Sequence, residues 1–580
     1  MIKILFKKSL VIVLSFLILI TAFVTDFSGL KVFAATEGNF TYTLSNGKAT
    51  ITLCKSTAAG DIEIPTALGG CPVTEIGSMA FWGCTGITSV SIPKSVTTVK
   101  SNAFKNCSSL KTVYITDLAA WCNIDFADYY SNPLFYAKNL YLNNKLVSDL
   151  VIPESVTNIK DFAFYNCNSI TSVTFPKGLN SVGKDAFYKC NSLNKVNISD
   201  LTAWCGIRFN NYKSQPLYYA ENLYLDDVLI TDLLLPDGLS YISDYAFYNC
   251  KSIKSILIPT SVTNIGNYAF ASCLNISYVT IPHSVTDIGN YAFYLCQNLI
   301  SVTLGNTVKS IGNYAFYNCA NLSSINIPNS VTDIGNYAFS GCDALSNIII
   351  PDSVTAIWEG TFYNCKALKS IVIPLNVTFL GEYAFSKCSE LKEVIIKGNV
   401  TDISSYAFAY CDNLKKIYLP KELTNVQDAA FYNTEAITDI YYGGSADDWK
   451  NVTVGIDNGS FSNAMLHYNS LAQEHNFSDK WTVDLLPTYS ANGIKSHHCL
   501  EIGCNEKSDV TVINLFAIPD IDNNGSLSAD DLVLLKKVIL GISKVETNAE
   551  INVYSSITDL NDDGKNNVMD LIRLKKIMLK

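Results

Sequence analysis

The sequence predicts a repeat solenoid of parallel β-strands with irregular or short helical turns, followed by a small all-α domain. Two observations predict this architecture. A phenylalanine, in most cases preceded by alanine, recurs at a constant step, as in Phe247, Phe270 and Phe293, and the tail at 519–580 contains two similar acidic segments that start at Asp520 and Asp559. A period in the twenties indicates coils that bury their apolar faces only against one another.

The N-terminus, residues 1–34, predicts an export signal. An uncharged run from Ser9 to Thr25 follows several lysines and precedes Val32-Phe33-Ala34, which fits a cleavage site. An uncleaved anchor is the alternative, because the run is nearly long enough to span a bilayer. We expect a secreted, extracellular chain with no membrane segment after cleavage.

Thirteen repeat units are predicted at residues 64–443, after an N-terminal cap at 35–63. In one unit, Ile253, Ile256 and Ile258 suit a short buried strand, while Val262 and Ile265 supply more of the interior. The repeat phenylalanines are Phe81, Phe104, Phe164, Phe187, Phe247, Phe270, Phe293, Phe316, Phe339, Phe362, Phe385, Phe408 and Phe431.

The recurring line IPxSVTxIGxxAFxxCxxL, as in IPTSVTNIGNYAFASCLNI, closely resembles the BspA-like leucine-rich repeats of bacterial surface proteins. The resemblance covers roughly residues 60 to 467. It implies a fold and a binding function and does not imply a reaction.

Two inserts interrupt the repeats and match one another along their length, which makes Trp121 and Trp204 equivalent. A third copy, with Trp449, follows the last unit, and we expect residues 444–469 to close the solenoid as a C-terminal cap. Each tryptophan is expected to be buried against a short helix and not to form a ligand platform.

Twelve of the 18 cysteines fall three residues after a repeat phenylalanine, from Cys84 to Cys411. Stacked side chains point the same way, so we expect buried thiols that fill space, with a disulfide ladder as the alternative. Cys54 and Cys71, outside this column, could form a disulfide.

The composition and motifs argue against several functions. A net charge of -10 and a pI near 5.1 disfavour nucleic acid as a partner. The five histidines form no HExxH or Cys/His motif, and no GxSxG or phosphate loop is present. We expect a protein that is not an enzyme. A glycoside hydrolase acting on polysaccharide is the minority alternative, because a carboxylate pair leaves no local signature.

Residues 470–518 resemble a small His/Cys module found in bacterial surface proteins of this kind. Zinc bound by His475, His498, Cys499 and Cys504 is one possibility. However, Tyr489 stands where the module has a cysteine, and Cys499 and Cys504 are too widely spaced. A disulfide or a plain structural linker is therefore the preferred expectation.

The tail, residues 519–580, contains two calcium-loop patterns, DIDNNGSLSADD and DLNDDGKNNVMD. Calcium takes six to eight oxygens, and such loops offer side chains at positions 1, 3, 5 and 12 and a carbonyl at position 7 around a glycine at position 6. We expect two calcium ions. The predicted ligands are Asp520, Asp522, Asn524, the carbonyl of Ser526 and Asp531 in the first loop, and Asp559, Asn561, Asp563, the carbonyl of Lys565 and Asp570 in the second.

An aspartate at position 12, followed by leucine and by a helix ending in paired lysines, resembles a type I dockerin. That resemblance implies docking to a cohesin module on the scaffoldin of a cellulosome-like complex, in the context of polysaccharide degradation. The contact residues that it implies are Ala529, Asp530, Lys537, Val568, Met569 and Lys576.

A possible ligand patch is predicted on the exposed face of the repeat sheet, where outward residues become apolar toward the C-terminal units. Its residues are Ile349, Val372, Ile395, Tyr418 and Tyr441. Contiguous exposed apolar surface usually indicates contact with a partner, here an unknown polysaccharide or protein. The alternative is that β-branched residues simply suit strands. The main rival for the whole protein is an adhesin-like surface protein that binds host or neighbouring-cell proteins.

Overall fold

The computed structural model describes residues 34–470 and the backbone of three further strands, at 477–485, 493–499 and 507–513. The chain divides into two compact units, one ending at Leu146 and the other beginning at Val147. In the described residues, no helix combines the length and apolarity needed to cross a membrane, and the run from Ser9 to Thr25 lies outside them.

The first unit begins with an antiparallel hairpin layer and continues as parallel coils. One sheet contains β1 (Ala34–Glu37), β2 (Phe40–Ser45), β3 (Lys48–Cys54), β6 (Cys71–Ile76), β8 (Thr98–Val99) and β10 (Asp125–Phe126), with β5 (Ala67–Leu68) paired to β6. The other contains β4 (Gly60–Glu63), β7 (Ile87–Ile92), β9 (Thr112–Ile115), β11 (Leu140–Leu142) and β12 (Lys145–Leu146). Helices α2 (Leu118–Cys122) and α3 (Leu134–Ala137) belong to the first insert.

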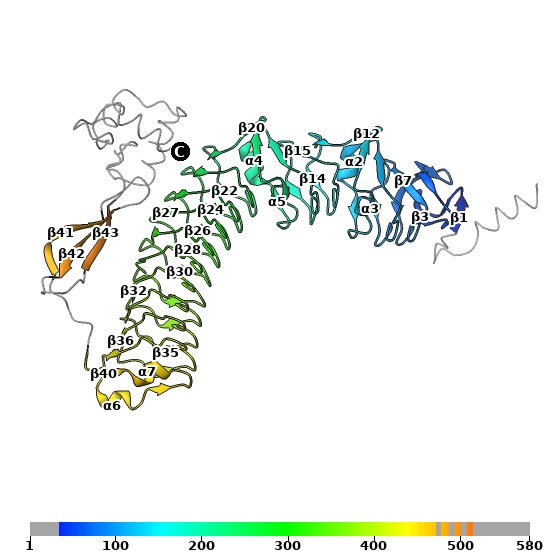
Figure 1. Cartoon of the computed structure of the whole chain (residues 1–580). Coiled ribbons are helices and arrows are strands. Elements are labelled where there is room, and N and C mark those ends of the chain that lie inside the picture. Colours follow the sequence, from blue (N-terminus) through cyan, green and yellow to red (C-terminus); the bar gives the residue numbers. More distant parts are fainter. Residues whose placement is uncertain (1–33, 471–476, 486–492, 500–506, 514–580) are drawn as a thin grey trace, which may run out of the picture. The chain divides into compact units, whose positions relative to one another are not determined.

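In the second unit, most coils contribute short strands to two rows of largely parallel sheets, visible as successive arrows in Figure 1. The first row contains β13 (Asp149–Val151), β15 (Ser172–Phe175), β17 (Lys195–Ile198), β19 (Leu223–Leu225) and β20 (Val228–Leu229); then β21 (Asp232–Leu234), β23 (Ser255–Leu257), β25 (Tyr278–Ile281), β27 (Ser301–Leu304) and β29 (Ser324–Asn326); then β32 (Ser370–Ile373), β34 (Glu393–Ile396), β36 (Lys416–Leu419), β38 (Asp439–Tyr442) and β40 (Met465–Tyr468).

The second row consists of shorter strands. It contains β14 (Asn158–Ile159), β16 (Ser181–Val182) and β18 (Arg208–Phe209); β22 (Tyr241–Ile242), β24 (Asn264–Ile265), β26 (Asp287–Ile288), β28 (Ser310–Ile311) and β30 (Asp333–Ile334); β31 (Ala356–Ile357) and β33 (Phe379–Leu380); and β35 (Asp402–Ile403), β37 (Asn425–Val426) and β39 (Thr453–Val454). Helices α4 (Leu201–Gly206) and α5 (Leu217–Ala220) form the second insert, and α6 (Ala446–Trp449) and α7 (Gly459–Asn463) lie near the end. The predicted solenoid is confirmed.

The strands β41 (Phe477–Leu485), β42 (Gly493–Cys499) and β43 (Lys507–Ile513) form a separate antiparallel sheet. The all-α tail predicted at residues 519–580 lies outside the described residues.

In the second unit, the repeat phenylalanines from Phe247 to Phe431 form a continuous stack. Phe293 and Phe316 have ring centroids 5.4 Å apart and planes within 1°, and both side chains are fully buried. Offset stacking of this kind stabilises by about 0.5–1.5 kcal/mol per pair beyond the area buried. Phe461 of α7 stacks on Phe431 at 4.5 Å and ends the row.

The cysteine column is bound to the backbone of the neighbouring coil. The Cys296 thiol donates to the carbonyl of Phe270 at 3.2 Å, and no disulfide joins the cysteines that the structure describes. Burial raises the pKa of Cys296 to about 12. The expectation of a buried thiol column is confirmed.

The suggested disulfide between Cys54 and Cys71 is wrong. Both residues lie on neighbouring parallel strands, but the register pairs Ala49 with Val73 and Ile51 with Ile76. Cys71 therefore lies at the N-terminal end of the two paired strands and Cys54 at their C-terminal end, so the two thiols are not opposite one another. Cys54 instead extends the column, since the thiol of Cys84 reaches its carbonyl at 3.9 Å.

The insert tryptophans are buried as expected. Trp121 in α2 and Trp204 in α4 are each 1% exposed. The Trp204 indole Nε1 donates to the carbonyl of Ala246 at 2.9 Å, which ties the insert to the following coil. Trp449 is half-buried and packs edge-on against Tyr442, with ring centroids 5.0 Å apart.

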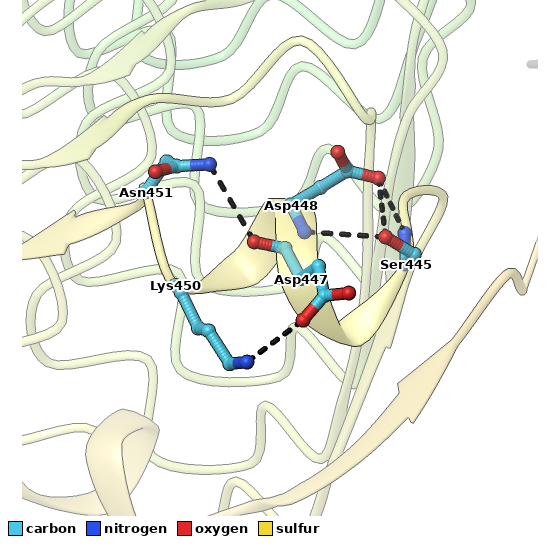
Figure 2. A network of polar contacts seen from close by, with 5 residues as sticks. All are labelled: Ser445, Asp447, Asp448, Lys450 and Asn451. Carbon is cyan, nitrogen blue, oxygen red and sulfur yellow. Dashed lines mark hydrogen bonds and ion pairs between the residues drawn. The ribbon is translucent and has the colours of Figure 1, made fainter.

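The third insert copy supplies the last strand of both rows, β39 and β40. Asn458, 2% exposed, accepts the Phe431 N–H at 2.9 Å, in the place of the carbonyl that a following coil would provide. Helix α6 starts at a capping box, shown in Figure 2, in which Ser445 N donates to Asp448 Oδ2 at 2.8 Å. Side chains thus satisfy the Phe431 N–H and backbone N–H groups at the start of α6.

Candidate ligand-binding site

The outward face of the last sheet in the first row carries a line of apolar and aromatic side chains. Strand register places Val372, Ile395, Tyr418, Tyr441 and His467 directly beside one another on β32, β34, β36, β38 and β40. The residues on either side of the first four are buried, because side chains alternate along a strand, whereas on the last strand Leu466 is half-buried and Tyr468 exposed. We call these five residues the sheet ladder.

Three rings of the sheet ladder are stacked. The ring centroids of Tyr418 and Tyr441 are 4.5 Å apart with an interplanar angle of 11°, and those of Tyr441 and His467 are 4.5 Å apart at 12°. The rings cover one another's faces, so all three are only half-exposed, whereas Val372 is 43% exposed. The ladder therefore offers a ligand the outer edges of a rigid aromatic stack.

A polar row runs beside the sheet ladder. His467 Nε2 lies 2.8 Å from Asp439 Oδ1, and the Thr438 hydroxyl donates to Asp439 Oδ2 at 2.8 Å. These two hydrogen bonds, that of His467 first, lower the pKa of the Asp439 carboxyl. Lys416 occupies the position on β36 that pairs with Asp439 on β38. The aromatic stack is thus bordered by groups that can bind a polar ligand.

His467 was not among the residues predicted for the patch. The signal that identifies it is the third insert copy, in which Leu466-His467-Tyr468 aligns with Leu140-Tyr141-Leu142 of the first. Tyr141 holds the equivalent place beside Tyr114, with ring centroids 5.1 Å apart.

Ile349 does not belong to the sheet ladder. Residues 345–350 form no strand, and the first row is interrupted between β29 and β32. The neighbours of Ile349, Ile348 and Ile350, are buried, which keeps the inward and outward alternation expected of the patch, and its part in a ligand site stays a prediction. Ile349 is 46% exposed, but strand pairing does not align it with Val372.

The hollows beside the insert tryptophans are small. Two shallow hollows beside Trp121 and Trp204 each hold about 10 Å³, close to the minimum for one water molecule. Within the described ranges, no group of three or more His, Cys, Asp or Glu side chains is arranged to hold a metal ion. The arrangement suits binding of an extended partner along an open face.

The comparisons with known proteins agree with this architecture. The model of the BspA type leucine-rich repeat region matches residues 54–127, 137–215, 220–346 and 332–464. The chain belongs to the BspA-type leucine-rich repeat family. A search of curated proteins finds no match.

Several solved structures contain similar repeats. A leucine rich cell surface protein from Faecalibacterium prausnitzii A2-165 is 25% identical, with 73% of this chain and 97% of that chain covered and a TM-score of 0.38. A leucine-rich repeat protein from Bacteroides ovatus ATCC 8483 is 22% identical over 71% of this chain and 100% of that one, with a TM-score of 0.39. The pneumococcal vaccine antigen PcpA is 17% identical over 76% and 97%, with a TM-score of 0.36.

The other predicted sites of this BspA-type protein fall beyond the described side chains. The calcium ligands from Asp520 to Asp570 and the cohesin contacts from Ala529 to Lys576 lie outside the described residues. Of the possible zinc ligands, His475 and Cys504 also lie outside, while His498 and Cys499 are described only as backbone in β42.

Proposed function

We propose that this BspA-type protein is a secreted, non-catalytic binding subunit that docks through a C-terminal dockerin to a cohesin of a cellulosome-like complex. Its solenoid presents the sheet ladder to an extracellular polysaccharide or protein. The observation that carries the binding role is the stacked Tyr418–Tyr441–His467 edge on an exposed sheet.

The sheet ladder suits recognition for two physical reasons. Its rings are held in place by stacking and by strand pairing, so little conformational entropy is lost when a ligand binds. It also combines apolar surface with the hydrogen-bonded pair of Asp439 and His467. Aromatic groups beside polar ones are typical of binding surfaces.

The docking role rests on the two calcium loops of the tail. Each loop brings three carboxylates, a glycine at the turn and a backbone carbonyl at the spacing that calcium requires. Ligands that are scattered and charged repel one another without metal, so calcium binding supplies the folding energy of such a module.

Cohesin capture tests the docking role. The mature chain is titrated with Ca²⁺ and passed over immobilised cohesins, with Asp531→Ala, Asp570→Ala as the variant. We expect capture by the wild type that is lost on chelation and in the variant. No capture by any cohesin would reject docking and favour the adhesin-like alternative.

Ligand binding is tested separately with a glycan array and with protein pull-downs from extracellular fractions. The doubly substituted Tyr418→Ser, Tyr441→Ser chain is compared with Thr303→Ser, a change at the equivalent outward position of β27. Loss of a bound ligand in the first variant alone supports the sheet ladder as its site. Unchanged binding in both rejects that site. Release of reducing sugar from polysaccharide would instead support a hydrolase.

A further inference from the structure

One coil of the second unit departs from the repeat in four consecutive residues. Trp358-Glu359-Gly360-Thr361 stands where each of the four preceding coils has Gly-Asn-Tyr-Ala. The first position is restrictive: a Cβ added to Gly335 would lie 2.6 Å from the backbone N of Asn313. The same atom at Gly381, in the following coil, would lie 2.7 Å from the backbone N of Glu359. Other units have Lys100, Lys160, Ser243, Ser404 or Gln427 at this position. However, a tryptophan between coils that need glycine departs from its immediate neighbours, and such local departures are expected at functional sites.

The Trp358 side chain lies on the surface in a fixed orientation. It is 40% exposed, and its indole Nε1 donates to Asp333 Oδ1 at 2.8 Å. Its ring is 5.5 Å from that of Phe379, which is 45% exposed. Ala356, directly opposite Phe379 in the strand pairing, has a small side chain that leaves room for the indole to reach from Asp333 to Phe379. Trp358 and Phe379 together form what we call the aromatic platform.

The neighbouring residues of the altered coil are also re-arranged. Gly360 has φ +59°, and a Cβ there would lie 2.2 Å from the ring of Tyr337, which therefore packs over this glycine. The Tyr337 hydroxyl donates to Glu359 Oε1 at 2.7 Å. The four substitutions thus act as one local rearrangement around the platform.

Carboxylates lie at both ends of the aromatic platform. Asp333 accepts the indole N–H on one side, and Asp402, one unit after Phe379, lies on β35 beside β33 on the other. Both side chains are exposed. Two exposed rings, tilted by 48° to one another and bordered by hydrogen-bond acceptors, match a twisted chain that is apolar on its faces and rich in hydroxyl donors at its edges.

We propose that the aromatic platform binds a neutral, β-linked polysaccharide chain. Pyranose rings joined by equatorial bonds present C–H groups that pack on the faces of Trp358 and Phe379, and their hydroxyls donate to Asp333 and Asp402. Carboxylates at both ends oppose nucleic acids and acidic polymers. A protein interface needs an apolar patch of several hundred Å², wider than two rings between aspartates.

The platform is separate from the sheet ladder. Trp358 and Phe379 belong to β31, β33 and their flanking turns in the second row, whereas the ladder lies on the β32–β40 sheet of the first row. The inference also does not depend on docking, so the Asp531→Ala, Asp570→Ala chain is expected to bind the same oligosaccharides as the wild type.

Isothermal titration of the full mature chain with cellohexaose, xylohexaose and mannohexaose tests the proposal, with acrylamide quenching of tryptophan fluorescence as a second readout. The variants are Trp358→Gly and Phe379→Asp. The first restores the glycine of the neighbouring coils, and the second restores the aspartate found at the equivalent position of β30 and β35. Trp82→Ala is the matched control, because Trp82 is 56% exposed and lies in the first unit. Thermal unfolding of every variant checks its fold.

We expect at least one hexasaccharide to bind the wild type and to protect Trp358 from quenching. Each platform variant should weaken binding by about tenfold or more, while Trp82→Ala leaves it unchanged. The proposal is overturned if the wild type binds none of the three sugars, or if both platform variants bind as tightly as the wild type. Capture of a protein that is lost in Trp358→Gly, without sugar binding, would show that the platform is a protein interface.

Discussion

The thiol of Cys319 donates to the backbone carbonyl of Phe293, in the preceding coil, at 3.2 Å. The same bond recurs along the column, and in the last unit Thr434 replaces cysteine and donates its hydroxyl to Phe408 at 2.7 Å. The position therefore selects a small side chain that can donate to the carbonyl of a neighbouring coil.

This relationship predicts how the column tolerates substitution. Cys319→Ala removes the donor, leaves the Phe293 carbonyl without it and opens a small space, so we expect a loss of about 1–2 kcal/mol in the free energy of unfolding. Cys319→Thr should lose less, because Thr434 already performs this role. Urea unfolding measures both. A threonine variant less stable than the alanine variant would show that volume, and not the hydrogen bond, decides.

The buried thiols should also resist chemical modification. Burial raises the pKa of Cys296 and of Cys388 to about 12, so neither forms a thiolate near neutral pH. We expect Ellman's reagent to label the column only in denaturant, and dithiothreitol to leave the melting temperature unchanged. Rapid labelling of the native column at pH 8 would contradict this.

An asparagine ladder predicts a second stability effect. Asn290 Oδ1 accepts the N–H of Asn313 at 2.7 Å, and Asn267 and Asn313 do the same for the coils that follow them. Asn290→Ala leaves a backbone donor of the next coil without this partner, which should cost about 1–2 kcal/mol. Asn306→Ala, at an exposed turn, is the matched control and should change stability little. Equal losses in the two variants would reject the ladder.

The Asp439–His467 pair predicts a pH dependence. Hydrogen bonds from His467 and Thr438 lower the pKa of Asp439, so the stability that they contribute is present above the ordinary carboxyl pKa of about 4 and is lost as the pH falls through the lowered value. Comparison of melting temperatures for wild type and Asp439→Asn should show a gap at pH 7 that closes below about pH 4. Exposed Asp412→Asn should show no such trend. A gap that is constant with pH would contradict the assignment.

Calcium removal is predicted to affect the tail alone. Since metal binding supplies the folding energy of such loops, chelation should expose residues 519–580 to limited proteolysis while the repeat region stays intact. The Asp531→Ala, Asp570→Ala chain should be cut equally with and without calcium. A tail that resists protease in chelator would refute this.

The sequence was sufficient to predict the features that repeat. The constant step between the repeat phenylalanines identified the solenoid, and the position of the cysteines within each unit identified a column of thiols. The burial of Trp121 and Trp204 followed from their place in two matching inserts. The first two of these inferences used many equivalent residues, so a single exception did not mislead them.

The features that the sequence did not reveal depend on contacts between coils. The pairing of β3 with β6 decides that Cys54 meets Cys84 and not Cys71. His467 joins the sheet ladder only because β40 pairs with β38, and Ile349 lies outside the ladder because its segment forms no strand. Trp358 was not singled out from the sequence, because its significance lies in its contacts with Asp333 and Phe379 in other coils.

The contacts between coils have a consequence for how this protein can change in length. From Phe247 to Phe339, each unit passes nearly the same ring and thiol contacts to the next, so the junction formed by deleting or duplicating a whole unit resembles the junctions already present. The middle of the second unit can thus act as an adjustable spacer. Unequal recombination of its gene would alter the distance between the second insert and the sheet ladder without disturbing either.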